Sequence, residues 1–230
     1  MLGLGRRWPP IVMIRILDEE GHPVVGELLT TLRCVTRQVD RDAFRRAMKR
    51  LGCYLGYELA RDLPRTTRRV TTPLGSREEP VLDCQPVLAT VLRAGLPLWD
   101  GMLEALPDAD TLVLGAARKE GALDKETGRM EIDISYQSKA STDGRPLVYV
   151  DPMLATGSTL MELHPRVIAT TGTPSQVIIA GAIAYRPTLE RLSQALGASV
   201  IVASADDELT DQGYIVPGLG DAGDLAFGGA

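Results

Sequence analysis

The residues best suited to chemistry lie in one segment, Leu147 to Thr159, which reads LVYVDPMLATGST. Its apolar run ends at Asp151, and a turn containing Thr156, Gly157 and Ser158 follows before an expected helix. Ligands of open α/β sheets bind beyond the carboxyl ends of the strands, and the N–H groups that open a helix attract anions. Asp151 would repel a phosphate but suits sugar hydroxyls. The pattern favours a ribose phosphate site, with an ordinary capped turn as the alternative.

A second glycine-rich segment, GLGDAG from Gly218 to Gly223, has the spacing G-x-G-x-x-G. The dinucleotide-binding motif of that form opens a helix inside a βαβ unit and needs an acidic residue about 20 positions later. Too few residues follow Gly218 for that unit. The sequence also lacks the Gly-Lys-Ser/Thr of a P-loop. Neither nucleotide motif therefore explains this segment, and a flexible glycine tail is the simplest alternative.

The elements that must position these loops alternate between strand and helix. Apolar runs typical of buried strands occur at 87–93, 111–117, 147–151, 177–184 and 199–205. Helical apolar spacing also predicts an N-terminal helical segment, 22–62, in which Asp40 is a good N-cap. This alternation predicts an α/β fold with a mostly parallel five-stranded sheet flanked by helices. We expect one domain, 1–230.

One long, charged stretch, Lys119 to Gly144, interrupts the alternation. Within it, MEIDISY alternates apolar and polar residues, which predicts a half-exposed strand of a β-hairpin. We expect a β-hairpin flap at 119–144, with a decorative surface hairpin as the alternative.

Three further local expectations follow from the sequence. Ile11 to Leu17 is a candidate short strand, and residues 61–76 look extended and partly exposed. Pro165 falls inside the helix expected after Ser158 and should kink it or end it.

Composition narrows the classes of function. Hydrophobic residues make up 44% of the chain, which is enough for a sizeable core. The net charge of −5 argues against a nucleic-acid or anionic-membrane partner, because such partners usually require a basic surface. No apolar run is long enough to span a bilayer, and the N-terminus does not resemble a signal peptide. Three scattered cysteines indicate a reducing compartment. We expect a soluble, cytoplasmic protein in which His22 and His164 are structural or surface residues.

Together these motifs resemble a known family. VDPMLATGST resembles the loop that binds phosphoribosyl diphosphate (PRPP) in type I phosphoribosyltransferases. DPMLATG and GYIVPGLGDAGD (213–224) resemble the uracil phosphoribosyltransferase family more narrowly, and VLRAGLPLWDG (91–101) resembles its diphosphate-binding loop. The resemblance covers about Gly21 to Phe227.

The resemblance implies an enzyme of pyrimidine salvage that converts uracil and PRPP to UMP and diphosphate. It also implies Mg²⁺ carried mainly by PRPP, with no metal site made by the protein alone, and a homo-oligomer, dimer or larger. Two alternatives remain. One is a phosphoribosyltransferase for another base, and the other is a non-catalytic, nucleotide-binding relative.

Site roles follow from the resemblance position by position. The catalytic residues would be Arg93, Arg118, Asp151 and Asp221, with the arginines at the leaving diphosphate and the carboxylates at the ribose and Mg–PRPP. All four would bind PRPP, together with Pro152, Met153, Leu154, Ala155, Thr156, Gly157, Ser158 and Thr159. Uracil would be bound by Ile215, Gly220, Asp221 and Ala222. Ser158 and Pro97 stand where the family usually has glycine.

Overall fold

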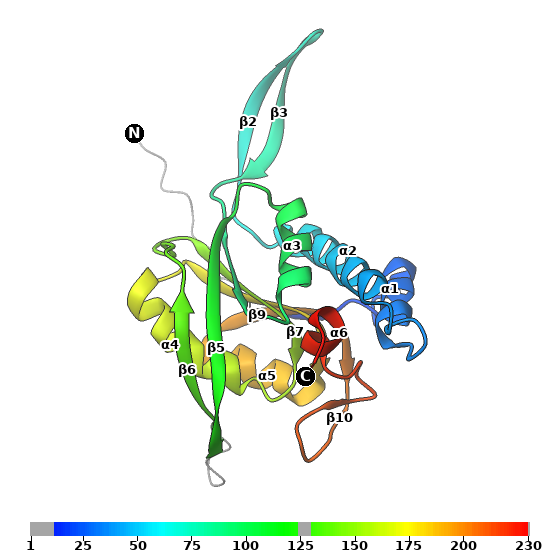
Figure 1. Cartoon of the computed structure of the whole chain (residues 1–230). Helices are drawn as coiled ribbons and strands as arrows, with labels where there is room; N and C mark the ends of the chain where they lie inside the picture. The colour runs from blue at the N-terminus through cyan, green and yellow to red at the C-terminus, as the bar shows by residue number, and fades with distance from the viewer. Residues whose placement is uncertain (1–11, 124–129, 230) are drawn as a thin grey trace.

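The computed structural model describes residues 12–123 and 130–229, with side chains described outside 117–133. The strands of its central sheet are β1 (Ile14–Ile16), β4 (Val87–Val91), β5 (Asp110–Leu123), β6 (Met130–Gln137), β7 (Pro146–Leu154), β8 (Gln176–Tyr185) and β9 (Ala198–Asp206). They form a seven-stranded sheet in the order β1-β9-β8-β7-β4-β5-β6 (Figure 1). Two small antiparallel pairs are separate from it, β2 (Arg65–Thr72) with β3 (Gly75–Leu82), and β10 (Glu208–Leu209) with β11 (Ile215–Val216).

The five parallel strands expected from the sequence are confirmed as β4, β5, β7, β8 and β9. The sheet is wider than that core because each edge gains a strand. The candidate N-terminal strand is β1, which pairs parallel with β9, and the MEIDISY segment is β6, which pairs antiparallel with β5. The hairpin is therefore present, although its tip, 124–129, lies outside the described residues. Its role as a flap stays a prediction.

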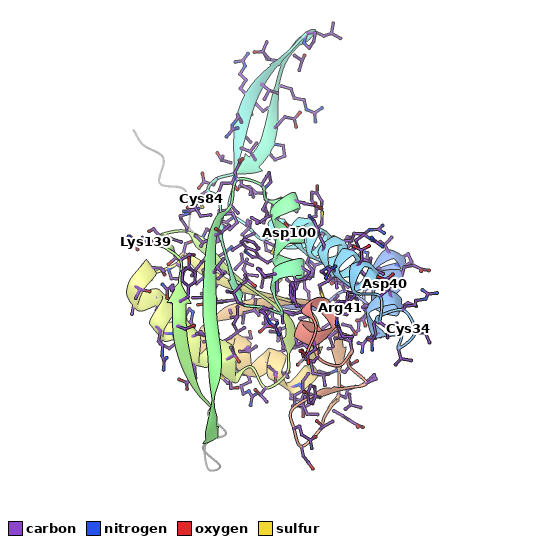
Figure 2. The ribbon with its side chains drawn as sticks, in the orientation of Figure 1. Cys34, Asp40, Arg41, Cys84, Asp100 and Lys139 are labelled. Carbon is purple, nitrogen blue, oxygen red and sulfur yellow. The ribbon has the colours of Figure 1, made fainter. Side chains whose placement is uncertain are left out.

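Helices cover both faces of the sheet (Figure 1). One face is covered by α1 (Pro23–Arg33), α2 (Arg41–Ala60), α3 (Leu96–Ala105) and the short α6 (Ala222–Phe227). The other is covered by α4 (Ser158–Thr171) and α5 (Arg186–Leu196). Asp40, the expected N-cap, accepts hydrogen bonds from the backbone N–H groups of Asp42 and Ala43 at the start of α2 (Figure 2). None of the described helices is long and apolar enough to cross a membrane.

The apolar runs of the central strands follow from this two-sided cover. Side chains alternate between the faces of a strand. Leu88 of β4 packs into the core below α1–α3, whereas Val87 and Ala89 pack into the core below α4 and α5. In β7, Val148 faces the first core and Tyr149 the second. Both faces are buried, so the sequence shows continuous apolar runs instead of alternation.

The helices α2 and α3 approach each other at the level of the backbone. A Cβ added at Gly52 of α2 would lie 1.9 Å from the carbonyl oxygen of Leu98, and one at Gly101 of α3 would lie 1.7 Å from that of Lys49. Any larger residue at either position would force the helices apart. This contact fixes α3, and hence the loop that precedes it, against the N-terminal helices.

The expectation that Pro165 ends the helix is wrong, because α4 continues to Thr171. The alternative expectation, a kink at Pro165, stays a prediction. Leu163 and Val167, on either side of the proline, are fully buried in the core. His164 also pairs with the buried Tyr149, with 3.0 Å between His164 Nδ1 and the phenol oxygen. Packing of this kind outweighs a cost of about 3 kcal/mol for an interior proline. Burial lowers the pKa of His164 and raises the pKa of Tyr149.

The segment expected to be extended and partly exposed contains β2, which pairs with β3 over its whole length. This hairpin projects away from the body of the molecule (Figure 1). At its turn, Leu74 is fully exposed. The pairing itself was not evident from the sequence, because both strands are polar and nearly all exposed.

Candidate active site

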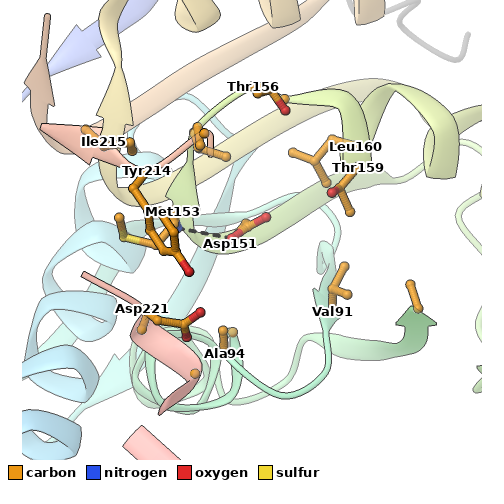
Figure 3. A pocket seen from close by; sticks show the side chains of 18 of the residues that line it. Val91, Ala94, Asp151, Met153, Thr156, Thr159, Leu160, Tyr214, Ile215 and Asp221 are labelled. Carbon is orange, nitrogen blue, oxygen red and sulfur yellow. Dashed lines mark hydrogen bonds between the residues drawn. The ribbon is translucent and has the colours of Figure 1, made fainter. Parts of the chain in front are cut away.

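A cavity of about 300 Å³ opens at the carboxyl ends of the central strands. Most of its walls come from three separated parts of the chain. They are the end of β4 with the loop that follows it, the end of β7 with the loop that leads into α4, and the segment 212–223 near the C-terminus. Ala116 of β5 adds one further lining residue. The position agrees with the rule that ligands of α/β sheets bind beyond the carboxyl edge. Figure 3 shows the side chains that face this pocket.

The loop after β7 forms the wall expected to hold a phosphate. The Oδ1 atom of Asp151 accepts a hydrogen bond of 3.1 Å from the backbone N–H of Met153 (Figure 3). Gly157 precedes α4 with φ +71°, and the hydroxyls of Thr156 and Ser158 lie 2.8 Å apart. The helix then starts at Ser158, so its first N–H groups open towards the loop. Such an arrangement attracts anions.

The helix α5 supports this loop from behind. The Thr188 hydroxyl donates to the carbonyl of Ala155 at 2.5 Å, and Arg191 donates to the carbonyl of Thr156. A Cβ on Gly157 would lie only 2.9 Å from Thr188 Cγ2. Glycine is therefore needed here both for its backbone angle and for the close approach to α5.

The loop between β4 and α3 forms the second wall. Leu92 donates its backbone N–H to the carbonyl of Leu114 at 2.8 Å, which ties the loop to β5. A Cβ on Gly95 would lie 2.0 Å from Thr90 Oγ1, so this glycine packs directly on β4. Leu92 and Ala94 line the pocket, whereas Arg93 between them is exposed and does not.

The C-terminal segment forms the third wall. Ile215 is buried, and Tyr214 beside it is about half exposed (Figure 3). Asp221 caps α6 by accepting a hydrogen bond of 2.9 Å from the N–H of Asp224. Both Asp221 and Asp151 line the same pocket. Carboxylates from two different walls therefore line one pocket.

The structure brings most of the expected site residues together. Those that line the pocket are Asp151, Met153, Leu154, Ala155, Thr156, Gly157, Thr159, Ile215, Gly220, Asp221 and Ala222. Pro152 is buried in β7 and Ser158 opens α4, and neither is among the lining residues. The side chain of Arg118 lies outside the described part of the chain, although its backbone pairs with Ile132 in the hairpin.

Sequence reasoning missed several lining residues. They include Gln212, Gly213, Tyr214, Gly223 and Leu160. Gly213, Tyr214 and Gly223 stand within the motif GYIVPGLGDAGD, and that membership was the available signal. Gln212 and Leu160 have no comparable signal, because their side chains reach the pocket only after distant segments have been folded together.

The donor set of the site suits a phosphorylated sugar better than a bound metal cluster. Within the described residues, no three His, Cys, Asp or Glu side chains come together to hold a metal ion. The cysteines of this part of the chain are free, and Cys34 and Cys84 lie well apart (Figure 2). The polar groups of the pocket are backbone N–H and C=O groups, hydroxyls, the carboxamide of Gln212 and the carboxylates of Asp151 and Asp221.

The mostly parallel sheet, with its pocket at the carboxyl edge, has the fold of the type I phosphoribosyltransferases. The structure is similar to that of an adenine phosphoribosyltransferase from Leishmania donovani, with a TM-score of 0.54 over 91% of this chain and 89% of that one, at 14% identity. It is more similar to the AQ2163 protein from Aquifex aeolicus, with a TM-score of 0.79, 31% identity and coverage of 94% and 98%. The first of these similarities concerns the fold alone.

Sequence comparisons identify the particular family. The family model for uracil phosphoribosyltransferase matches residues 19–229. The uracil phosphoribosyltransferase of Methanothermobacter thermautotrophicus is 37% identical, with 94% of this chain and 96% of that protein covered. That of Streptomyces griseus is also 37% identical, with 94% and 99% covered. The chain belongs to the uracil phosphoribosyltransferase family.

Proposed function

We propose that the protein transfers the phosphoribosyl group of PRPP to uracil, forming UMP and diphosphate. One observation carries the proposal. The loop 151–159 and the segment 212–223, far apart in the sequence, form opposite walls of one pocket at the carboxyl edge of the sheet. A transferase of this kind needs a sugar-phosphate site and a base site in contact, since a bond must form between them.

The loop 151–159 would hold the 5′-phosphate and the ribose. The backbone N–H groups around Gly157 and at the start of α4 would bind the phosphate oxygens, helped by the hydroxyls of Thr156 and Thr159. Asp151 would accept hydrogen bonds from the ribose hydroxyls. The support of α5 behind the loop means that these groups need little rearrangement when PRPP binds.

The loop 91–95 would hold the diphosphate. Arg93 is exposed beside the pocket mouth, where its planar guanidinium can bind phosphate oxygens and keeps its charge at any relevant pH. Arg118 would add a second positive charge. Mg²⁺ fits the carboxylates of Asp151 and Asp221 only as a companion of PRPP, because it prefers phosphate oxygens and water, and it would neutralise charge on the diphosphate.

The C-terminal segment would hold uracil. Glycine at position 220 leaves its backbone open to a flat ring, and Ala222 adds only a methyl group. The buried Ile215 lies at the other end of this wall. Recognition would then come mainly from backbone N–H and C=O groups, which match the alternating donors and acceptors of a pyrimidine edge.

The chemistry would depend on position and charge. The bond between ribose C1 and the diphosphate breaks, a bond between C1 and N1 of uracil forms, and the proton that N1 carried is released. Positive charge develops on the sugar and negative charge on the leaving group. Arg93 and Arg118 would stabilise the leaving diphosphate, and Asp221 would stabilise the sugar. Holding both substrates in one pocket supplies the remaining advantage by orientation.

The test is to incubate purified protein with uracil, PRPP and Mg²⁺ and to measure UMP, with cytosine, adenine, guanine and hypoxanthine as alternative bases. We expect UMP, dependent on both PRPP and Mg²⁺. Efficient product from a purine would instead indicate a phosphoribosyltransferase for another base. Binding of PRPP with no product from any base would indicate a nucleotide-binding relative without catalysis.

We also expect a homo-oligomer in the cytoplasm. The hairpin β2–β3 supports self-association, because an isolated two-stranded hairpin is marginally stable in water and this one extends away from the body with nearly every residue exposed. Light scattering on the intact chain and on a variant with a shortened hairpin would test this. A monomeric intact chain would refute it.

The cytoplasmic location is supported by the sparse, unpaired cysteines.

A further inference from the structure

A partly buried ion pair, in which the Arg33 side chain is 22% exposed, lies behind the segment 215–222, which is the pocket wall proposed to hold the base and is called the base wall below. Arg33, in the last turn of α1, donates from Nη1 to Asp206 Oδ2 at 2.7 Å and from Nη2 to Asp206 Oδ1 at 2.9 Å. The Nη2 group also donates to the hydroxyl of Ser204 at 2.8 Å. Asp206 ends β9 and is only 9% exposed. A bidentate pair with so little access to water is stronger and better defined than a surface ion pair.

This pair holds both backbone polar groups of Gly218. The carbonyl of Gly218 accepts from Arg33 Nη1 at 2.9 Å, and its N–H donates to Asp206 Oδ2 at 3.0 Å. Gly218 has φ +53°, and a Cβ there would lie 2.1 Å from the carbonyl oxygen of Ile215. The turn from Ile215 to Gly218 is therefore tight, and its last residue is held by hydrogen bonds to Arg33 and Asp206.

Gly218 lies between the two parts of the base wall. Ile215 on one side and Gly220 on the other line the pocket, whereas Gly218 does not. Leu219 is buried next to it. With its amide nitrogen turned towards the loop, Gln38 donates to the carbonyl of Leu219 at 3.1 Å. A glycine-rich segment has little stiffness of its own, so these contacts must define its position.

We propose that Arg33 and Asp206 are positioning residues for the pyrimidine base, acting through Gly218 on the wall 215–222. The inference rests on the proposed function, since it takes that wall to be the base site. It adds that the N-terminal helix α1 and the end of β9, neither of which lines the pocket, determine how well the base is held. Loss of the pair should weaken the binding of the base more than that of PRPP. Asp221 is the one PRPP contact that we assign to this wall, whereas the phosphate loop is supported separately by α5.

The first test is steady-state kinetics of Asp206→Asn and Arg33→Lys. The asparagine keeps the shape but has only one side-chain oxygen. With that oxygen at the position of Oδ2, it still accepts from Gly218 and from Arg33 Nη1, but its NH2 group faces the Nη2 donor of Arg33, so the bidentate charged pair is lost. The lysine keeps the charge but cannot contact both oxygens of Asp206 and the Gly218 carbonyl. We expect the KM for uracil to rise about tenfold or more in Asp206→Asn, and less in Arg33→Lys. The KM for PRPP should change less than about threefold in both.

The matched control is Arg186→Ala. Arg186 donates to Asp207, the neighbour of Asp206, at 2.8 Å, and this pair is exposed. The control should leave both KM values unchanged, because an exposed pair contributes little. Equal increases in the two KM values, or none, in Asp206→Asn would overturn the proposal. The proposal would also be overturned if Arg186→Ala raised the KM for uracil as much as Asp206→Asn does.

The second test does not depend on activity. Amide hydrogen exchange of the segment 213–222 should be faster in Asp206→Asn than in the wild type, while exchange in 151–159 stays the same. Unchanged exchange in 213–222 would overturn the positioning role. If the wild-type protein forms no UMP, the proposed function fails, and this comparison still decides whether the pair fastens the wall.

Discussion

Replacing Gly157 by alanine tests how closely the phosphate loop must approach α5. Gly157 has φ +71°, where an L residue costs about 1–2 kcal/mol. The new Cβ would lie 2.9 Å from Thr188 Cγ2 and 3.0 Å from Leu192 Cδ2. Loop and helix would have to separate by roughly 0.5–1 Å to restore normal contacts. Overpacking adds about 1–3 kcal/mol, so the free energy of unfolding should fall by about 2–5 kcal/mol.

The assay compares Gly157→Ala with Gly144→Ala by thermal unfolding. Gly144 has nearly the same φ, +70°, but nothing lies within 4 Å of a Cβ added there. The control should therefore lose only about 1–2 kcal/mol. For a chain of this size 1 kcal/mol corresponds to about 2–4 °C, so Gly157→Ala should melt roughly 2–12 °C below the control.

Activity gives an independent measurement on the same pair of variants. Gly157 lines the pocket and Gly144 does not. A loop pushed off α5 moves into the phosphate site, so the KM for PRPP should rise about tenfold in Gly157→Ala and stay unchanged in Gly144→Ala. Equal melting temperatures for the two variants would refute the argument from close approach.

Three further predictions concern the site and the fold. Asp151→Asn and Arg93→Ala should each slow UMP formation roughly 30–150-fold with the melting temperature little changed, and near-normal rates in either would refute its assigned role. Gly101→Ala should destabilise the protein by about 3 kcal/mol or more, because its Cβ would meet the Lys49 carbonyl; a loss below about 1 kcal/mol on urea unfolding would contradict the backbone contact. Burial lowers the pKa of His164 in the folded state, so the unfolded state binds more protons below about pH 6.5 and stability must fall as the pH decreases. His164→Gln should lose less stability than the wild type between pH 7.5 and 5.5, and an identical loss would show that His164 is not responsible.

Local pattern was sufficient where both the signal and its cause were local. The five central strands are apolar because they are buried on both faces, and the alternation of MEIDISY reports a strand at the edge of the sheet. The cap at Asp40 depends on hydrogen bonds within three residues. The phosphate loop was evident as a strand, a glycine turn and a helix start in succession. Each of these features is determined by residues close together in the chain.

Local pattern failed where a distant contact outweighed it. The helix α4 continues through Pro165 because Leu163 and Val167 are buried against the sheet. The hairpin β2–β3 carries no apolar alternation, so its pairing left no signal. The close contact of α2 and α3 at Gly52 and Gly101 could not be predicted for the same reason, because a glycine inside a helix does not indicate which backbone lies next to it.

The sequence by itself determined the α/β alternation and, through family resemblance, the family. Its assignment of the phosphate loop and of both substrate sites stays a prediction. Only the tertiary structure placed β4 next to β7, which sets the loop 91–95 beside the loop 151–159. It also brought the segment 212–223 over both loops and joined Arg33 to Asp206 behind it. The physical reason is that periodicity records which face of an element is buried, whereas the choice of neighbour depends on contacts between residues far apart in the chain, such as Arg33 and Asp206, which are 173 positions apart.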